Sequence, residues 1–475
     1  MNTWQLFKDG KWRPARSGQT YEVTNPANGE VVAVAASGDA EDAADAVRAA
    51  EAAFSAWAAT PAKERAELLE RLAALLEEDS EELARLITLE MGKPLAEARG
   101  EVKISADYLR WNAGEGVRAY GQMIPPPAGD KRLLTLRQPV GPVAAITPWN
   151  FPLSMVARKL GPALAAGCTV VLKPAGQTPG PAVRFCELAA RAGIPDGVIN
   201  LVTGPSSPIG DTLLQEEAIR KITFTGSTAV GKQLMAQAAE QVKRVSMELG
   251  GHAPLLVFED ADLDAAVAGA VSSKFRNSGQ TCICANRIYV QASIAEAFTQ
   301  KFKAKVDELV VGDGLQEETT IGPLINADAV DKVQEQVQDA LDKGAKLIKG
   351  GRRSDREGNF YEPTVLADVD ESMTITTEET FGPVAPIYVF ETEEEAIAKA
   401  NATPYGLAAY YYTRDLARSI RVYEGLQYGI IGCNDAVPTT AEAPFGGFKE
   451  SGIGREGGPG SIDDFLETKF VSIAI

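Results

Sequence analysis

The residue best suited to nucleophilic chemistry in this 475-residue chain is Cys282. It lies in Gly279-Gln280-Thr281-Cys282-Ile283-Cys284, where glycine and polar neighbours favour a loop. A thiolate in such a loop would be the strongest nucleophile in a chain with one histidine, His252. A buried structural thiol is the alternative interpretation. A single histidine excludes a multi-histidine metal site, and no Cys/His pair has metal-ligand spacing, so we expect no metal.

Four further segments carry groups suited to catalysis or anion binding: Thr147–Pro152, Phe224–Gly231, Met247–Gly251 and Glu379–Pro383. Two prolines would hold the Asn150 amide rigidly, as an oxyanion donor requires. Glu248 before two glycines could act as a base. The glycines of the second segment would let a helix N-terminus approach a phosphate. The alternative interpretations are a proline-rich turn for 147–152, a surface glutamate for Glu248 and an ordinary strand-to-helix turn for 224–231. Taken alone, 379–383 indicates only a turn.

The elements around these segments alternate between short apolar strands and helices. Such a pattern predicts a parallel sheet covered on both faces, with ligands beyond the carboxyl ends of its strands. The expected strands are 143–147, 169–172, 198–202, 222–224 and 242–247, with helices near 153–166 and 181–192.

The remaining elements suggest further domains, since one hydrophobic core rarely grows past roughly 300 residues. Residues 6–36 are expected to form short strands, and helical spacing runs from an N-cap at Asp39 to about Trp111. A second alternating stretch has expected helices at 263–277, 293–310 and 327–343. An isolated strand at 133–137 could pair with the tail, 465–475, unless the tail pairs with another subunit.

Composition limits the partners and the compartment. Apolar residues make up 45% and charged residues 24%, as in a soluble globular protein, and the net charge of −18 disfavours nucleic acid. No apolar run is long enough for a membrane span, and no secretory signal is visible. Five cysteines, an odd number, indicate a reducing compartment, so we expect the cytoplasm.

Together, in this order and spacing, these segments resemble the aldehyde dehydrogenase superfamily over essentially the whole chain. Met91-Gly92-Lys93-Pro94, Leu172-Lys173-Pro174-Ala175 and Pro444-Phe445-Gly446-Gly447 add to the resemblance. It implies an α/β fold with a Rossmann-type coenzyme domain (1–119 and 140–249), an α/β catalytic domain (250–455) and a small bridging sheet (120–139 and 456–475). Members use that sheet to build dimers or tetramers.

The resemblance also assigns roles. Cys282 would be the nucleophile, Asn150 the oxyanion donor together with the Cys282 N–H, and Glu248 the general base. Lys173 and Glu379 would hold the two cofactor riboses. Ser227 would contact the pyrophosphate, and Trp149 would line the cofactor channel. The other cofactor-binding positions it implies are Ile146, Thr147, Pro148, Ala175, Gly176, Gly226 and Phe381.

Two segments, 155–161 and 274–287, are similar to the succinate-semialdehyde dehydrogenase branch. There, arginines at the positions of Arg158 and Arg276 grip the distal carboxylate, which suits the guanidinium fork. A salt bridge to a neighbouring acid is the alternative for either arginine. The branch uses a serine where this chain offers Thr439 or Thr440, and Phe445 would complete the substrate site.

At Gly176, NAD-preferring members usually have a glutamate that repels the 2′-phosphate of NADP. The glycine removes that repulsion, so the cofactor is expected to be NADP or NAD, and Lys173 could pair with the phosphate.

The expected activity is oxidation of succinate semialdehyde to succinate with NAD(P)+, through a thiohemiacetal and a thioester on Cys282. Another carboxylate-bearing aldehyde, such as glutarate or 2-oxoglutarate semialdehyde, is the runner-up. Transfer of the acyl group to coenzyme A and a non-catalytic nucleotide-binding oligomer are further alternatives, against which Glu248 and the intact catalytic set argue.

The resemblance also suggests a reversible Cys282–Cys284 bridge. In an extended strand these residues would lie near the upper distance limit for a disulfide, so the loop would have to bend. Under this hypothesis Cys284 would resolve a sulfenic acid formed on a Cys282 of lowered pKa. The alternative is that Cys284 is only a small packing residue.

Overall fold

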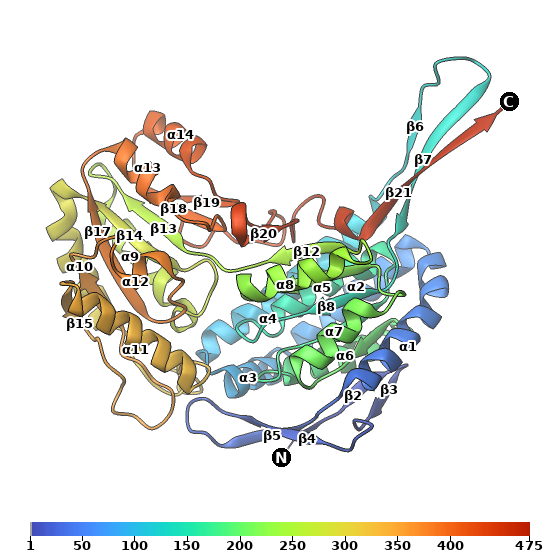
Figure 1. Cartoon of the computed structure of the whole chain (residues 1–475), viewed down its shortest axis with the longest axis horizontal. Helices are drawn as coiled ribbons and strands as arrows, with labels where there is room; N and C mark the ends of the chain where they lie inside the picture. The colour runs from blue at the N-terminus through green and yellow to red at the C-terminus, as the bar shows by residue number, and fades with distance from the viewer. Residues whose placement is uncertain (1) are drawn as a thin grey trace.

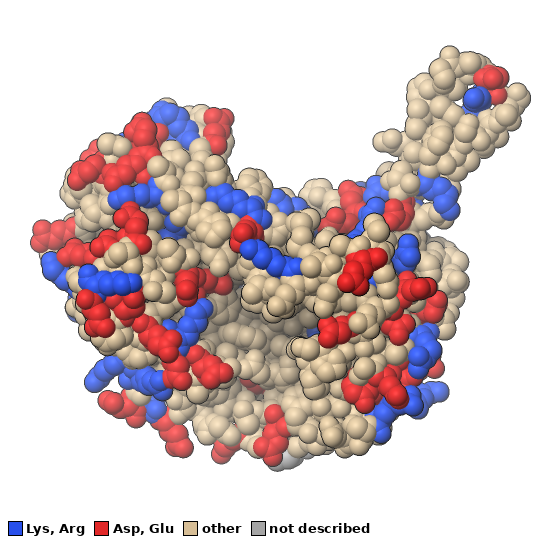
Figure 2. Space-filling view, in the orientation of Figure 1, with Lys and Arg blue, Asp and Glu red and all other residues tan. Residues whose placement is uncertain are grey.

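In this computed structural model, which describes residues 2–475, the carboxyl ends of the strands of one large, mostly parallel sheet face the amino ends of strands of a second large sheet. Figure 1 shows a lobe around each sheet and a small third sheet that projects from the body. Charged residues are sparse in the hollow between the two lobes, as Figure 2 shows.

The first large sheet contains the expected β/α alternation. Its strands are β2 (Leu6–Lys8), β3 (Lys11–Arg13), β8 (Val143–Ile146), β9 (Val170–Lys173), β10 (Ile199–Leu201), β11 (Lys221–Thr225), β12 (Arg244–Glu248) and β20 (Gly452–Ile453). They lie in the order β20-β12-β11-β8-β9-β10-β2-β3, and β8 to β12 are parallel. The apolar runs of β8, β9 and β10 are buried on both faces, as helices on either side require.

The helices of this lobe are α1 (Ala40–Ala59), α2 (Ala62–Glu78), α3 (Ser80–Met91), α4 (Leu95–Val117), α5 (Ser154–Ala166), α6 (Gly180–Ala192), α7 (Ser206–Gln215) and α8 (Thr228–Ala239). Asp39 caps α1 as expected, because its carboxylate accepts the N–H groups of Glu41 and Asp42. Every residue of α5 is buried, so this helix forms the centre of the lobe.

One expected strand begins two residues late. Val242 is 88% exposed and has a φ of 55°, in the left-handed region, so the chain is still in a turn there and β12 starts at Arg244. The N-terminal strands β1 (Asn2–Trp4), β4 (Thr20–Thr24) and β5 (Val31–Ala36) form a separate sheet in the order β1-β5-β4.

The second large sheet has the order β15-β16-β17-β14-β13-β18-β19 and is parallel except for its first strand. Its strands are β13 (Ala253–Val257), β14 (Ala285–Gln291), β15 (Lys346–Lys349), β16 (Thr364–Ala367), β17 (Val384–Phe390), β18 (Ala408–Tyr412) and β19 (Ile430–Cys433). The helices are α9 (Leu263–Phe275), α10 (Ala295–Asp307), α11 (Ala327–Asp342), α12 (Thr374–Thr377), α13 (Glu393–Asn401) and α14 (Leu416–Gly425).

Helix α9 ends two residues earlier than expected. Asn277, Ser278 and Gly279 have φ values of 52°, 55° and 77°, so the chain turns left-handed directly before the cysteine loop. Such angles are unfavourable for residues with a Cβ and need support from the surroundings.

The projecting sheet has the order β21-β7-β6 and confirms the expected partner of the tail. Strand β21 (Leu466–Ala474) runs antiparallel to β7 (Lys131–Pro139) over its full length, and β7 also pairs with β6 (Gln122–Ile124). Within residues 2–475, none of the helices is both long and apolar enough to cross a membrane.

Candidate active site

The topology of the first sheet places the sequence motifs at one edge. The chain runs from β8 outward through β9 and β10, then returns to β11 and β12 on the other side of β8. The strand order therefore reverses between β8 and β11, the usual ligand crevice of a doubly wound sheet. The loop after β8 carries Asn150, the loop after β11 carries Ser227, and Glu248 ends β12.

Two cavities follow this edge. The first, of about 360 Å³, is lined by Pro148, Trp149, Asn150, Met155, Thr225, Gly226, Ser227, Leu249, Gly250, Cys282, Ile325, Asn326, Ala329, Lys332, Glu379, Thr380 and Phe381. The second, of about 400 Å³, includes Gly176, Gly204 and Pro205. Both cavities share Ile325 and Asn326, so they adjoin along the cleft.

The groups along these cavities fit a dinucleotide. Ser227 caps the N-terminus of α8, whose free N–H groups suit a pyrophosphate. In the described part of the chain, the buried hydroxyls of Thr147 and Thr225 have no hydrogen-bond partner. Lys173 Nζ donates to Ser206 Oγ at 2.8 Å, and burial lowers the pKa of this lysine to about 8.

Most of the expected cofactor residues line the cleft. Ile146, Thr147, Lys173 and Ala175 instead lie in the strand ends and loops beside it. Burial raises the pKa of Glu379 to about 7. The Gly251 N–H, which donates to Glu379 Oε1 at 3.1 Å, opposes this rise. Sequence reasoning missed Lys332, whose Nζ donates to the Glu379 carbonyl at 2.7 Å. A single lysine in a polar helix has no sequence pattern around it that would predict a place in the cleft.

Cys282 lies where the cofactor cleft meets a third cavity, of about 300 Å³. It is partly exposed, within a turn in which Cys284 N–H donates to the Thr281 carbonyl at 3.2 Å. The expected loop is therefore confirmed.

The thiol is not ionised at rest. Burial, together with the nearby charge of Glu379, raises the pKa of Cys282 to about 12, and Arg158 only partly opposes this. The premise of a lowered pKa is therefore wrong for this state of the protein. A base must remove the proton before the sulfur attacks.

Asn150 shares the cofactor cleft with Cys282. Its side-chain Nδ2 donates to the Gln280 carbonyl at 3.0 Å, two residues before the cysteine. The amide is thus held against the cysteine loop.

Glu248 is buried beside a cluster of charges. Arg158 Nη2 lies 2.9 Å and Lys159 Nζ 2.6 Å from the two oxygens of Glu456. Burial and the negative charge of Glu456 raise the pKa of Glu248 well above its ordinary value, while Arg158 and Lys159 oppose the shift. Glu248 Oε2 has no hydrogen-bond partner among residues 2–475, so this oxygen is open to accept a proton.

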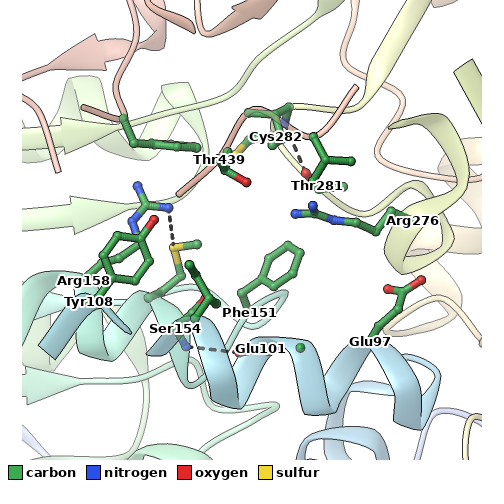
Figure 3. A pocket seen from close by; sticks show the side chains of 16 residues that line it. Glu97, Glu101, Tyr108, Phe151, Ser154, Arg158, Arg276, Thr281, Cys282 and Thr439 are labelled. Carbon is green, nitrogen blue, oxygen red and sulfur yellow. Dashed lines mark hydrogen bonds between the residues drawn. The ribbon is translucent and has the colours of Figure 1, made fainter. Parts of the chain in front are cut away.

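The third cavity carries arginines on opposite walls (Figure 3). Arg158 is paired with Glu456 and stacks 3.8 Å from the centre of the Phe445 ring. Arg276 lies 5.4 Å from the Phe151 ring and has no carboxylate within 4.0 Å in the described part of the chain. The salt-bridge interpretation therefore holds for Arg158, whereas Arg276 presents an unpaired cation.

The two threonines differ in position. Thr439 lines the cavity, whereas Thr440 is exposed and its hydroxyl donates to Glu442. Thr440 is therefore wrong as a cavity residue, because it points to the surface.

Cys284 is fully buried, with its Sγ 3.6 Å from the Lys274 carbonyl oxygen. The two cysteines lie in a turn rather than in an extended strand, and both thiols are free. The bridge stays a prediction.

Comparison with known proteins gives consistent matches. The model of the aldehyde dehydrogenase family matches residues 12–471. The succinate-semialdehyde dehydrogenase [NADP(+)] GabD of Escherichia coli (strain K12) is 52% identical over 471 residues, 99% of this chain and 98% of that protein. A glutarate-semialdehyde dehydrogenase of Pseudomonas putida is also 52% identical, with 99% and 98% covered. A crystal structure of an E. coli NADP dependent enzyme superposes with a TM-score of 0.99 at 51% identity, covering 100% and 98%.

The charge cluster makes a prediction about pH. In Glu456→Gln, a negative charge near Glu248 is lost and two cations are released from it, so the pKa of Glu248 should fall. A carboxylate base works when deprotonated, so the acidic limb of the kcat–pH profile for aldehyde oxidation should move to lower pH. An unchanged limb, or one moved to higher pH, in a protein with an unaltered circular dichroism spectrum would contradict this assignment.

Proposed function

The chain belongs to the aldehyde dehydrogenase family, and we propose that it oxidises succinate semialdehyde to succinate with NADP+ or NAD+. The observation that carries the substrate is the cavity that opens onto Cys282 and holds Arg158 and Arg276 on its walls. A substrate with an aldehyde at one end and a carboxylate at the other fits that arrangement. Glutarate semialdehyde is the second candidate, since an equally similar relative bears that name.

The residues would act in two stages. Glu248 accepts the thiol proton of Cys282, and the sulfur then attacks the aldehyde carbon. The oxyanion of the thiohemiacetal is held by the Asn150 amide and the Cys282 N–H. Ser227 and the other residues of the cleft would hold NADP+ or NAD+, which would supply the hydride acceptor that turns the thiohemiacetal into a thioester. Glu248 releases the thiol proton to solvent and then deprotonates the water that hydrolyses this thioester. The proton gained from water passes to the departing Cys282 sulfur as the carboxylic acid leaves.

We further propose that the protein self-associates and works in the cytoplasm. Phe470 and Ile473 of β21 and Met123 of β6 expose apolar side chains on the projecting sheet, a surface typical of an interface. The five free cysteines suit a reducing compartment. Light scattering that gives the mass of a monomer at micromolar concentration would contradict self-association.

The covalent chemistry is tested by two variants. Cys282→Ala should abolish dehydrogenation but keep cofactor binding, because the sulfur is needed only for the covalent steps. Glu248→Gln should slow hydrolysis of the thioester more than its formation, giving a burst of reduced cofactor in stopped-flow measurements. Full steady-state turnover by Cys282→Ala would overturn the proposal.

Replacing Arg276 and replacing Arg158 should affect different kinetic parameters. Arg276→Ala should raise KM for succinate semialdehyde roughly 30-fold or more, since losing one partner of a buried charge pair costs about 2–5 kcal/mol. It should barely affect butanal, which has no carboxylate.

Arg158→Ala should instead lower kcat for both aldehydes, because it also removes a partner of Glu456 beside the base. Equal KM effects of Arg276→Ala on both aldehydes would mean that Arg276 is structural.

Cofactor preference should depend on Gly176. A Cβ here would meet nothing nearer than the Tyr21 hydroxyl, at 3.7 Å, so a glutamate can be accommodated. Gly176→Glu should disfavour NADP relative to NAD by about 1–3 kcal/mol through like-charge repulsion. The ratio of kcat/KM for the two cofactors measures this, and an unchanged ratio would place the residue away from the ribose.

A further inference from the structure

Lys93, in the segment Met91-Gly92-Lys93-Pro94, is fully buried although it is a lysine. Its Nζ lies 2.6 Å from Glu101 Oε2 and donates to the backbone carbonyl of Asn150 at 2.8 Å. The ammonium also sits 3.7 Å from the centre of the Phe151 ring. One cation thus contacts two consecutive residues of the loop that carries the oxyanion donor.

The same segment joins the two lobes. Gly92 ends α3 with a φ of 92°, and a Cβ there would lie 2.6 Å from Pro323. The N–H of Leu95 donates to the Gly314 carbonyl at 2.9 Å. Lys93 is therefore fixed at its backbone by contacts with the catalytic lobe.

The carboxylates of α4 extend this arrangement. Glu101 Oε1 accepts the N–H groups of Leu153 and Ser154 at 2.8 and 3.2 Å and so holds the start of α5. Glu97 accepts the Asn277 N–H at 2.8 Å.

Asn277 completes the set from the other lobe. Its Nδ2 donates to the carbonyls of Asn150 and Gln280, each at 3.1 Å. The Asn150 carbonyl thus receives one donor from each lobe, and the strained left-handed turn at Asn277 is held by Glu97 and Asn150 together. Misplacing a catalytic group by about 1 Å can cost about 100-fold in rate.

We propose that Lys93 is a positioning residue that fixes the Asn150 amide for the oxyanion, with Glu101 and Asn277 as its partners. This inference rests on the role proposed for Asn150. Lys93 does not itself line the substrate cavity, although Glu101 and Phe151, which it contacts, do. It acts through the backbone of Asn150.

The test is a double-mutant cycle between Lys93→Met and Asn150→Ala in the full-length protein, with succinate semialdehyde and NADP+. Lys93→Met should lower kcat about 10- to 100-fold, with KM for NADP+ within about twofold. In the Asn150→Ala background, which should itself lose about 100-fold or more, it should change kcat less than about twofold.

The matched control is Lys221→Met. Lys221 is also fully buried and hydrogen-bonded, to Ser246, but lies at the opposite end of β11 from the motif loop. It should lower the thermal midpoint about as much as Lys93→Met yet leave kcat within about twofold. If Lys93→Met does not fold, the double-mutant cycle with Asn150→Ala is repeated with Lys93→Arg. This variant keeps a cation beside Glu101.

Three results would overturn the inference. An equal fold-loss from the Lys93 variant in both backgrounds would show that it acts independently of Asn150. Full activity of Asn150→Ala alone would instead remove the oxyanion role on which the inference rests. Loss of kcat in Lys221→Met equal to that in Lys93→Met would show a general effect of destabilisation and would also count against it.

Discussion

A buried, ionised carboxylate is costly unless it is paired with a cation, and two such pairs hold the centre of the candidate site in this molecule. Glu101 and Glu456 have side chains 0% and 6% exposed, and each faces a buried lysine. Both pairs brace α5: Glu101 holds the first turn by its N–H groups, and Glu456 binds Arg158 and Lys159 further along. Removing one partner of a buried pair typically costs about 3–5 kcal/mol, so the helix has little freedom to shift. Asn150, which precedes α5, and Arg158, which lies within it, are therefore also held in place.

The same desolvation sets the acid–base state of the site. Burial raises the pKa of both Cys282 and Glu248, so the thiol is neutral at rest and the Glu248 carboxylate is a stronger base than an ordinary glutamate. Because the thiolate is the form that peroxide oxidises, a resting thiol is protected between turnovers. The nucleophile then forms only when a base within reach is deprotonated, which links its reactivity to Glu248 rather than to a permanently lowered pKa.

The sequence was sufficient for the parts of the site that follow strand ends. Asn150, Ser227 and Glu248 lie where alternating apolar strands predict the carboxyl edge of a parallel sheet. It was not sufficient for contacts made across the chain: Lys159 and Glu456 are 297 residues apart, and nothing in either segment indicates the other. Nor does a local pattern predict non-glycine residues in a left-handed turn, as at Asn277. The choice between Thr439 and Thr440 depends on which way one loop faces, which periodicity does not encode.

The difference in binding free energy that separates succinate from glutarate semialdehyde is smaller than the one that separates an aldehyde with a carboxylate from one without. An uncharged aldehyde would leave the Arg276 cation unpaired in a cavity, a loss of the kind that discriminates strongly. One extra methylene changes binding by only about 1–3 kcal/mol. A few side chains along the cavity wall are enough to supply that difference, so relatives with either substrate name can share 52% of their residues with this chain. Under the proposed function, the charge of Arg276 would select the class of aldehyde and the cavity wall would select its length.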